Sequence, residues 1–273
     1  MVEFTRTKAG PSDRPGLDIL RPLQGPQFVD IHCHCLPNLD DGPQTIAESL
    51  SLCRSLVADS VTTVVATPHQ LGCFEGRNEA DAVRQATSAL NRELQTRKIP
   101  LRILPGADVR VDERIPDLLQ ADKLLTLADG GRYILLELPG DTIVDLRPLL
   151  EQLASMSVTA IITHPERNEY LIRHPQAVDS WLDLNAHLQI TAGSILGVFG
   201  SAAEQSAWRF LTLGMASLIA TDAHDRGPRC PRMREAYYAI SQRLGEKTAQ
   251  KLCVENPRGI LTGRDMTRPV RIE

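Results

Sequence analysis

The chain has 273 residues, of which 42% are hydrophobic and 23% charged, and its formal net charge is −4 at pH 7. This length fits one or two domains, and single α/β barrels are often as long. The mild acidity argues against a nucleic-acid or anionic-membrane binder. No apolar run approaches the roughly 18 residues of a membrane span, and residues 1–26 lack the hydrophobic core of a secretory signal. We therefore expect a cytoplasmic protein that does not insert into a membrane.

The six cysteines exclude several classes of enzyme. They are scattered and form no C-x-x-C pair, so reduced thiols are expected rather than disulfides or a zinc ribbon. No cysteine is followed six positions later by arginine, as the phosphate loop of a cysteine-dependent phosphatase requires. The glycine-rich phosphate-binding motifs G-x-x-x-x-G-K-[ST] and G-x-G-x-x-G are also absent.

Hydrophobic patterning predicts one domain of alternating strands and helices. Residues 1–26 are rich in proline, glycine and charge and are predicted to be a flexible extension, followed by a domain over 27–262 and a tail over 263–273. Short, consecutively apolar runs predict seven buried parallel strands. These runs are 28–31, 61–67, 101–107, 133–138, 158–163, 188–192 and 218–221.

The segments between these runs follow the helical period. Thr45 and Glu48 form a capping-box pattern before an apolar stripe that extends to Val57. Further helices are predicted at 83–94 and near 145–156, 175–184, 201–214, 231–243 and 246–254. About seven β/α units without a composition break favour a single TIM-like (β/α) barrel over an open, doubly wound sheet.

Histidines and carboxylates follow the predicted strands. Five of the seven histidines lie at carboxyl ends of strands, which converge on one face of a barrel. In an extended strand His32 and His34 point the same way while Cys33 points away, and Asp222 and His224 repeat that spacing. Such a nitrogen and oxygen ligand set suits zinc, manganese or iron, and this one is large enough for two or three ions.

Each motif also has a plain structural explanation. A single H-x-H or Pro-His is weak evidence, although Glu137 within an apolar strand would be costly to bury without a partner. Cys35 remains an alternative thiolate ligand, and His174 and His187 are expected to be structural or at the surface. The remaining candidates are arginines that follow metal motifs, where a guanidinium could bind phosphate or form a salt bridge with an acid such as Glu166. These arginines are Arg167 and Arg229.

Together these residues resemble the PHP (polymerase and histidinol phosphatase) family of metal-dependent phosphoesterases. The strings Asp30-Ile-His-x-His34, Asp40-Asp41-Gly-Pro43, Thr163-His-Pro-Glu-Arg167 and Glu255-Asn-Pro-Arg258 resemble its bacterial tyrosine-protein phosphatases, which are associated with capsule and exopolysaccharide synthesis. The resemblance extends over about residues 28 to 262 and implies a distorted (β/α)7 barrel.

The resemblance also implies a trinuclear metal centre, often manganese-dependent, and phosphate-contacting roles for Arg167 and Arg229. The implied ligands are His32, His34, Asp41, His69, Asp108, Glu137, His164, Asp222 and His224. Two positions depart from the family. Asp108 stands where a bridging glutamate is common, which puts one bridging contact in question, and Gln70 replaces a basic residue or histidine.

The leading hypothesis is therefore hydrolysis of phosphotyrosine on protein by a metal-bound hydroxide. The resemblance suggests the tail of a membrane-bound bacterial tyrosine kinase as a partner, and leaves an oligomer open. Two alternatives remain. One is a small-molecule phosphatase of the histidinol-phosphate type, and the other is a non-catalytic, metal-binding regulator of polysaccharide synthesis.

Overall fold

The computed structural model describes residues 25–140 and 142–267. Most of the predicted N-terminal extension and the end of the predicted tail lie outside the described residues, so these boundaries stay predictions. The described part of the tail packs on the domain, because Met266 is buried in its interior and the Tyr133 hydroxyl donates to the carbonyl of Arg264. No helix among the described residues is long and apolar enough to cross a bilayer.

All seven predicted strands are present, and every strand pair is parallel. The strands are β1 (Phe28–Cys33), β2 (Val61–Ala66), β3 (His69–Gln70), β4 (Arg102–Pro105), β5 (Asp108–Arg110), β6 (Tyr133–Glu137), β7 (Thr159–Thr163), β8 (His187–Thr191) and β9 (Leu218–Ala220). The short strands β3 and β5 were not predicted as separate elements. They continue β2 and β4 after breaks at Pro68, which has no N–H to donate, and at Gly106. A Cβ at Gly106 would lie 2.6 Å from the Val65 side chain, so only glycine fits this break.

The strands form two sheets rather than one closed barrel. The first has the order β1-β2-β4, and the second has the order β3-β5-β6-β7-β8-β9. The expectation of a seven-stranded barrel with a continuous ladder is therefore not confirmed. The physical reason is that the breaks after β2 and β4 carry the chain from the first sheet into the second.

The two sheets meet between β1 and β9. Here Cys33 and Ala223 form an isolated bridge, and the amide of Asp222 donates to the carbonyl of His32 at 2.8 Å. The buried Asp30 carboxylate adds a side-chain connection, because it accepts hydrogen bonds from both the amide and the hydroxyl of Thr221.

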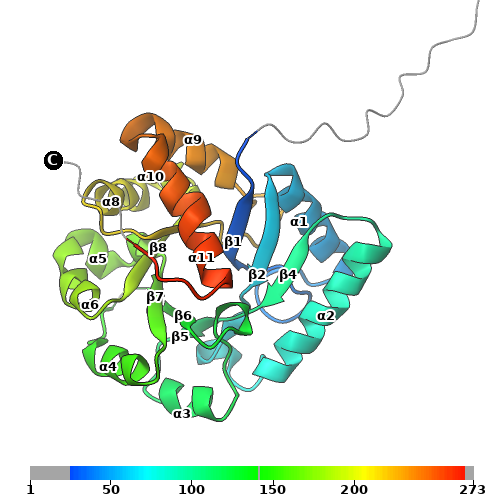
Figure 1. Ribbon diagram of the computed structural model, residues 1–273, viewed down its shortest axis with the longest axis horizontal. Coiled ribbons are helices and arrows are strands. Elements are labelled where there is room, and N and C mark those ends of the chain that lie inside the picture. Colours follow the sequence, from blue (N-terminus) through cyan, green and yellow to red (C-terminus); the bar gives the residue numbers. More distant parts are fainter. Residues whose placement is uncertain (1–24, 141, 268–273) are drawn as a thin grey trace, which may run out of the picture.

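Helices form an outer layer around the strands (Figure 1). They are α1 (Ile46–Ala58), α2 (Ala80–Thr96), α3 (Ile115–Gln120), α4 (Arg147–Ser155), α5 (Glu169–Arg173), α6 (Asp179–Asp183), α7 (Ala192–Ile195), α8 (Ser201–Thr212), α9 (Met233–Leu244), α10 (Glu246–Gln250) and α11 (Asn256–Leu261). Each predicted helix is found, and the capping box of Thr45 and Glu48 is formed. The helices that were not predicted, α3, α5, α7 and α11, are too short to show a helical period.

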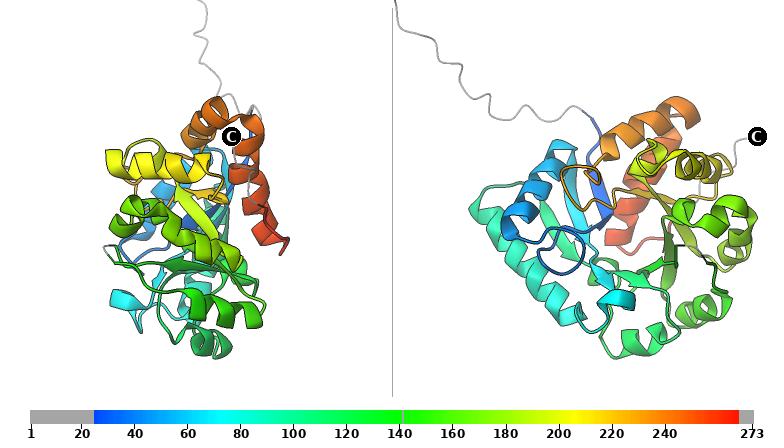
Figure 2. Two further views of the ribbon diagram at one scale, coloured as in Figure 1. Left: turned by 90° about the vertical axis from the view of Figure 1, so that its left-hand side faces the viewer. Right: turned by 180° about the vertical axis from the view of Figure 1, so that it is seen from behind.

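One end of the interior is filled by apolar side chains. Val29, Ile31, Leu135 and Ile161 belong to an inner cluster on which Ile260 of α11 packs. Helix α11, in red, crosses this end of the strands in Figure 1 and lies behind them in the reverse view of Figure 2. Polar side chains can therefore gather only at the opposite end, where the strands finish.

The connection through Asp30 predicts a specific loss of stability. We expect Asp30→Ala to lower the free energy of unfolding by about 3 kcal/mol, because the buried amide and hydroxyl of Thr221 would lose their acceptor. Urea unfolding measures this, with Asp145→Ala as the control, since Asp145 is exposed and pairs with Arg147. Equal stability of the two variants would contradict the connection.

Candidate metal centre

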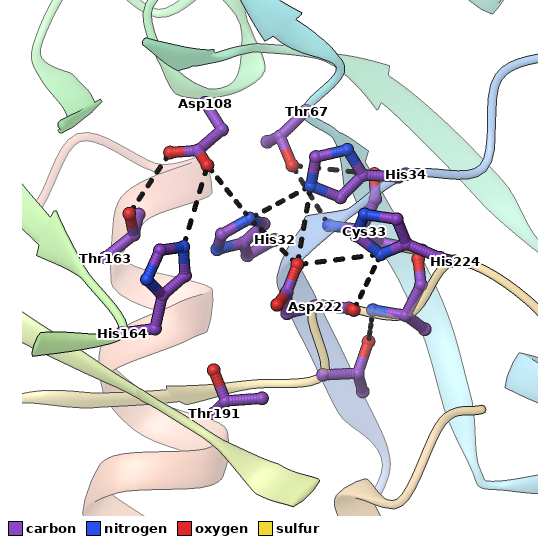
Figure 3. Close-up of polar contacts among 12 residues, drawn as sticks. His32, Cys33, His34, Thr67, Asp108, Thr163, His164, Thr191, Asp222 and His224 are labelled. Atoms are coloured by element: carbon purple, nitrogen blue, oxygen red, sulfur yellow. Dashed lines mark hydrogen bonds and ion pairs between the residues drawn. The ribbon is translucent and has the colours of Figure 1, made fainter. Parts of the chain in front are cut away.

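All nine predicted ligand residues lie together at the carboxyl ends of the strands. Their nitrogen and oxygen atoms form four overlapping groups, each able to offer three or four ligand atoms within 4.8 Å of one another. The groups are His34, Asp41, His69 and His224; His32, His34 and Asp222; His32, Asp108 and His164; and His69, Asp108 and Glu137. The shared members join the groups into one centre, part of which is drawn in Figure 3.

The H-x-H pair on β1 points into the centre. The Nε2 atoms of His32 and His34 are 3.2 Å apart. The Cys33 side chain lies instead in the outer apolar cluster, in which strand side chains such as Val64 pack with helix side chains such as Leu52. The register between β1 and β2 shifts between Asp30 and Cys33, so that Ile31 packs in the inner cluster and the two histidines still reach the centre. Such a shift redirects the side chains that follow it.

Buried acceptors orient both histidines from behind. His32 Nδ1 lies 2.8 Å from Gln189 Oε1, and His34 Nδ1 lies 2.6 Å from Asp40 Oδ2. A proton held on Nδ1 leaves the lone pair of Nε2 free to bind a cation. Of the two neighbouring aspartates, Asp40 therefore supports a histidine, while Asp41 faces the centre 3.1 Å from His224 Nε2.

The Asp222 carboxylate joins the histidines to both predicted arginines. Its Oδ1 lies 3.3 Å from His32 Nε2 and 3.4 Å from His34 Nε2. Its Oδ2 accepts from Arg167 at 2.6 Å and from Arg229 at 2.8 Å. Figure 3 shows Asp222 between the rings of His32, His34 and His224. The acid that pairs with Arg167 is thus Asp222, and not Glu166 as the sequence neighbourhood suggested.

Two residues of the centre have an unusual backbone. His164 and Asp222 have φ values of 34° and 51°, in the left-handed region that most residues avoid. His164 directly follows β7, and Asp222 follows β9 after one residue, Thr221. Strain of this kind is retained where the surrounding structure holds a functional side chain in place.

Asp108 lies at the middle of the second half of the centre. Its Oδ2 is 3.5 Å from both His32 Nε2 and His69 Nδ1, and its Oδ1 accepts from the Thr163 hydroxyl at 3.2 Å. Asp108 therefore reaches two of the four groups although it is one methylene shorter than glutamate. Gln70, the other departure, bonds to the backbone of Asn78 and Leu125 and takes no part in the groups.

Burial sets the protonation of the centre without metal ions. It lowers the pKa of His32 and of His69 to about 3, so both rings are neutral. Burial opposes the charging of His34 too, but Asp40 and Asp222 raise its pKa to about 10. Burial and the neighbouring Glu137 raise the pKa of Asp108, whereas Arg167 and His32 outweigh burial and lower that of Asp222.

Divalent cations fit this arrangement. The buried Asp108 Oδ2 has no hydrogen-bond donor, although it lies among three imidazoles. Neutral imidazoles and carboxylates are the ligands that zinc, manganese and iron use in proteins. Cations would also offset the repulsion among carboxylates that have been brought together out of water.

The other candidates lie outside the centre. His187 is buried with its Nδ1 2.8 Å from the Ser217 hydroxyl, and His174 packs its ring on Tyr170. Cys35 belongs to the outer apolar cluster and to none of the four groups. One arginine was missed by sequence reasoning. Arg110 of β5 pairs with Glu137 at 3.1 Å, and no motif marked it.

Comparison with known proteins places the chain in a family. The family model described as "Capsular polysaccharide synthesis, CpsB/CapC" matches residues 28–262. The chain belongs to the CpsB/CapC family. The tyrosine-protein phosphatase YwqE of Bacillus subtilis is 33% identical over 243 residues, which cover 88% of this chain and 94% of that protein. The tyrosine-protein phosphatase CpsB of Streptococcus agalactiae is 28% identical over 241 residues, covering 86% and 98%.

Solved structures agree with this family membership. A chain from the crystal structures of Bacillus subtilis YwqE and Streptococcus pneumoniae CpsB, which are described as metal-dependent tyrosine phosphatases, superposes with a TM-score of 0.85. It is 32% identical and covers 90% of this chain and 100% of its own. The phosphotriesterase homology protein of Escherichia coli, at 13% identity and a TM-score of 0.53, shares the fold alone.

The pairing of Arg167 with Asp222 predicts a stability effect that depends on metal. In EDTA we expect Arg167→Met to lower the free energy of unfolding by about 2 kcal/mol, because the buried Asp222 would lose one of its two arginine partners. Bound divalent ions supply that positive charge, so the loss should shrink in manganese. Urea unfolding in both buffers measures it, and Arg226→Met, which removes an exposed arginine bonded to Ser51, is the control. Equal losses in EDTA and manganese would contradict this electrostatic account.

Proposed function

We propose that this chain is a metal-dependent protein-tyrosine phosphatase of capsule or exopolysaccharide synthesis. The observation that carries the proposal is one carboxylate, Asp222, that faces candidate metal ligands through Oδ1 and two arginines through Oδ2. Cations held by these ligands would lie beside the two guanidinium groups, and both kinds of positive charge favour the binding of a phosphoryl group. Phosphotyrosine is proposed as the substrate because the relatives are named tyrosine-protein phosphatases.

The nine predicted ligands are proposed to hold two or three divalent ions, with manganese as the first candidate and iron or zinc as alternatives. Such ions supply a water of lowered pKa as the nucleophile and neutralise charge on the phosphoryl oxygens. His32 and His34 are held for this purpose by Gln189 and Asp40, which keep their Nε2 atoms turned toward the centre.

Arg167 and Arg229 are proposed to bind the phosphoryl oxygens. Their side chains are 19% and 29% exposed, and Asp222 fixes their position. Two donors placed where negative charge increases in the transition state favour reaction over mere binding. The leaving phenolate has a pKa near 10, which lessens the need for a strong general acid.

The proposed substrate is phosphotyrosine on a cytoplasmic polypeptide, such as the tail of a membrane-bound tyrosine kinase. The support is membership of the capsule-synthesis family together with the names of its phosphatases. The cell compartment and the kinase partner rest on that likeness.

We expect activity to depend on metal and not on thiols. EDTA should abolish hydrolysis of p-nitrophenyl phosphate and of a phosphotyrosyl peptide, and manganese should restore both. Cys73→Ser, which removes the exposed thiol, should leave the rates unchanged. Activity that survives EDTA would contradict the metal mechanism, and faster hydrolysis of an alkyl phosphate such as histidinol phosphate would favour a small-molecule phosphatase.

We also expect Arg229→Met to reduce kcat/KM for the phosphotyrosyl peptide by about 10²-fold, because one donor to the developing charge is lost. Steady-state kinetics at saturating manganese measures this. The bound metal, counted by mass spectrometry, should stay as in the wild type. A change of less than about twofold in kcat/KM would exclude Arg229 from the phosphoryl site.

A further inference from the structure

A pocket lies directly beside the candidate metal centre, at the carboxyl ends of β5, β6 and β7. Its volume is about 270 Å³, and its lining includes Arg110, Glu137, Pro139, His164, Arg167 and Asn168. Glu137 and His164 are candidate ligands, so the pocket is continuous with the centre. It is lined by two guanidinium groups, of which only that of Arg167 has a role in the proposed function.

Arg110 is held in place by the sheet. It lies opposite Glu137 in the register of β5 and β6, and its Nη1 donates to the carbonyl of Leu138 at 2.7 Å. Its Nη2 is 3.1 Å from Glu137 Oε2. The side chain is nevertheless 34% exposed, so further N–H groups are available to a ligand.

The wall beside Arg167 is also fixed. The Asn168 amide donates to the carbonyls of Pro139 at 2.7 Å and Thr142 at 3.0 Å, and its oxygen accepts from the Leu171 amide. The segment after β6 is thereby tied to the segment after β7. Both walls are thus built before a ligand arrives, which lowers the cost of binding.

The partner of Arg110 is Glu137, which is also a candidate metal ligand. Glu137 faces His69 Nδ1 at 3.5 Å and His164 Nε2 at 3.8 Å, in addition to Arg110. If a cation takes this carboxylate, the negative charge opposite Arg110 is largely neutralised. The partly buried Arg110 guanidinium would then be stabilised by a new anionic partner, and the pocket that it lines offers space for one.

We propose that Arg110 is a specificity-determining residue that binds an anionic side chain, a carboxylate or a second phosphate, close to the phosphotyrosine on the substrate polypeptide. Arg167 and Arg229 bind the phosphoryl group that is hydrolysed, and Arg110 binds the neighbouring anion from the other side of the pocket. This inference rests on the proposed phosphatase function and names the class of polypeptide that the site prefers.

The test compares three phosphotyrosyl peptides that differ at one residue beside the phosphotyrosine, which is alanine, glutamate or phosphoserine. Each is assayed for kcat/KM at saturating manganese. Each is also made as a non-hydrolysable phosphonate, whose affinity for the manganese-loaded protein is measured by fluorescence anisotropy. The proteins are the wild type, Arg110→Met, Arg110→Lys and Arg114→Met. Arg114 is the matched control, because it is an exposed arginine on the segment after β5 that pairs with Asp112 and Glu75.

The wild type should prefer at least one anionic peptide over the alanine peptide by about tenfold, the effect of one charge-assisted hydrogen bond. The preferred peptide identifies the anion as carboxylate or phosphate. Arg110→Met should lose the preference, Arg110→Lys should keep part of it, and Arg114→Met should keep all of it. Because the readout is a ratio between peptides, a general loss of activity does not affect it.

A wild type without preference, or an Arg110→Met variant that keeps it, would overturn the inference. A variant whose binding of all three phosphonates falls equally, together with its content of bound metal, would show instead that Arg110 only positions Glu137. Failure of the phosphatase function has a different signature, since the wild type would then hydrolyse none of the peptides while the phosphonate affinities still report on Arg110.

Discussion

The carboxylate of Asp222 is the electrostatic link on which the site depends. One of its oxygens faces the imidazoles of His32 and His34, and the other is held by Arg167 and Arg229. These arginines keep it ionised although it is buried. The left-handed backbone at this residue shows that the end of β9 is shaped to present it. The Asp222 carboxylate thus contacts candidate cation ligands through one oxygen and anion-binding arginines through the other.

The fold leaves this end of the strands as the place where such a cluster can form. An apolar cluster and α11 fill the other end of the interior, and the hydrogen bonds between Asp30 and Thr221 connect the two sheets at the strands that carry the H-x-H pair and Asp222. The carboxylates that Arg167 and Arg229 do not neutralise need another source of positive charge. Asp108 shows this most clearly, because burial and Glu137 favour its protonated form in the absence of metal ions.

Much of this arrangement could be predicted from the sequence. Short apolar runs are a sufficient signal for buried parallel strands, and polar residues at their ends must meet when the strands lie side by side. That reasoning brought together residues as distant as His32 and His224. It did not predict that the ladder divides into two sheets, because the breaks after β2 and β4 arise from the missing N–H of Pro68 and from close packing at Gly106 rather than from hydrophobic pattern.

The direction in which individual side chains point was harder to predict from the sequence than the positions of the strands. The neighbours Asp40 and Asp41 are equivalent in sequence, yet one supports His34 and the other faces the centre. Gln189 and Arg110 lie within ordinary strand patterns. The partner of Arg110, Glu137, follows from the register of β5 and β6, and the partner of Gln189, His32, lies on β1 in the other sheet. Roles that depend on contacts between strands leave no motif along the chain.

Anomalous X-ray scattering at the manganese edge, from crystals of catalytically active protein, shows whether the four groups hold metal ions. We expect at least two peaks, each within coordination distance of residues from the four groups that share His32, His34, His69 and Asp108. Active protein with no anomalous peak at these residues would contradict this expectation, and so would peaks that lie only elsewhere on the molecule.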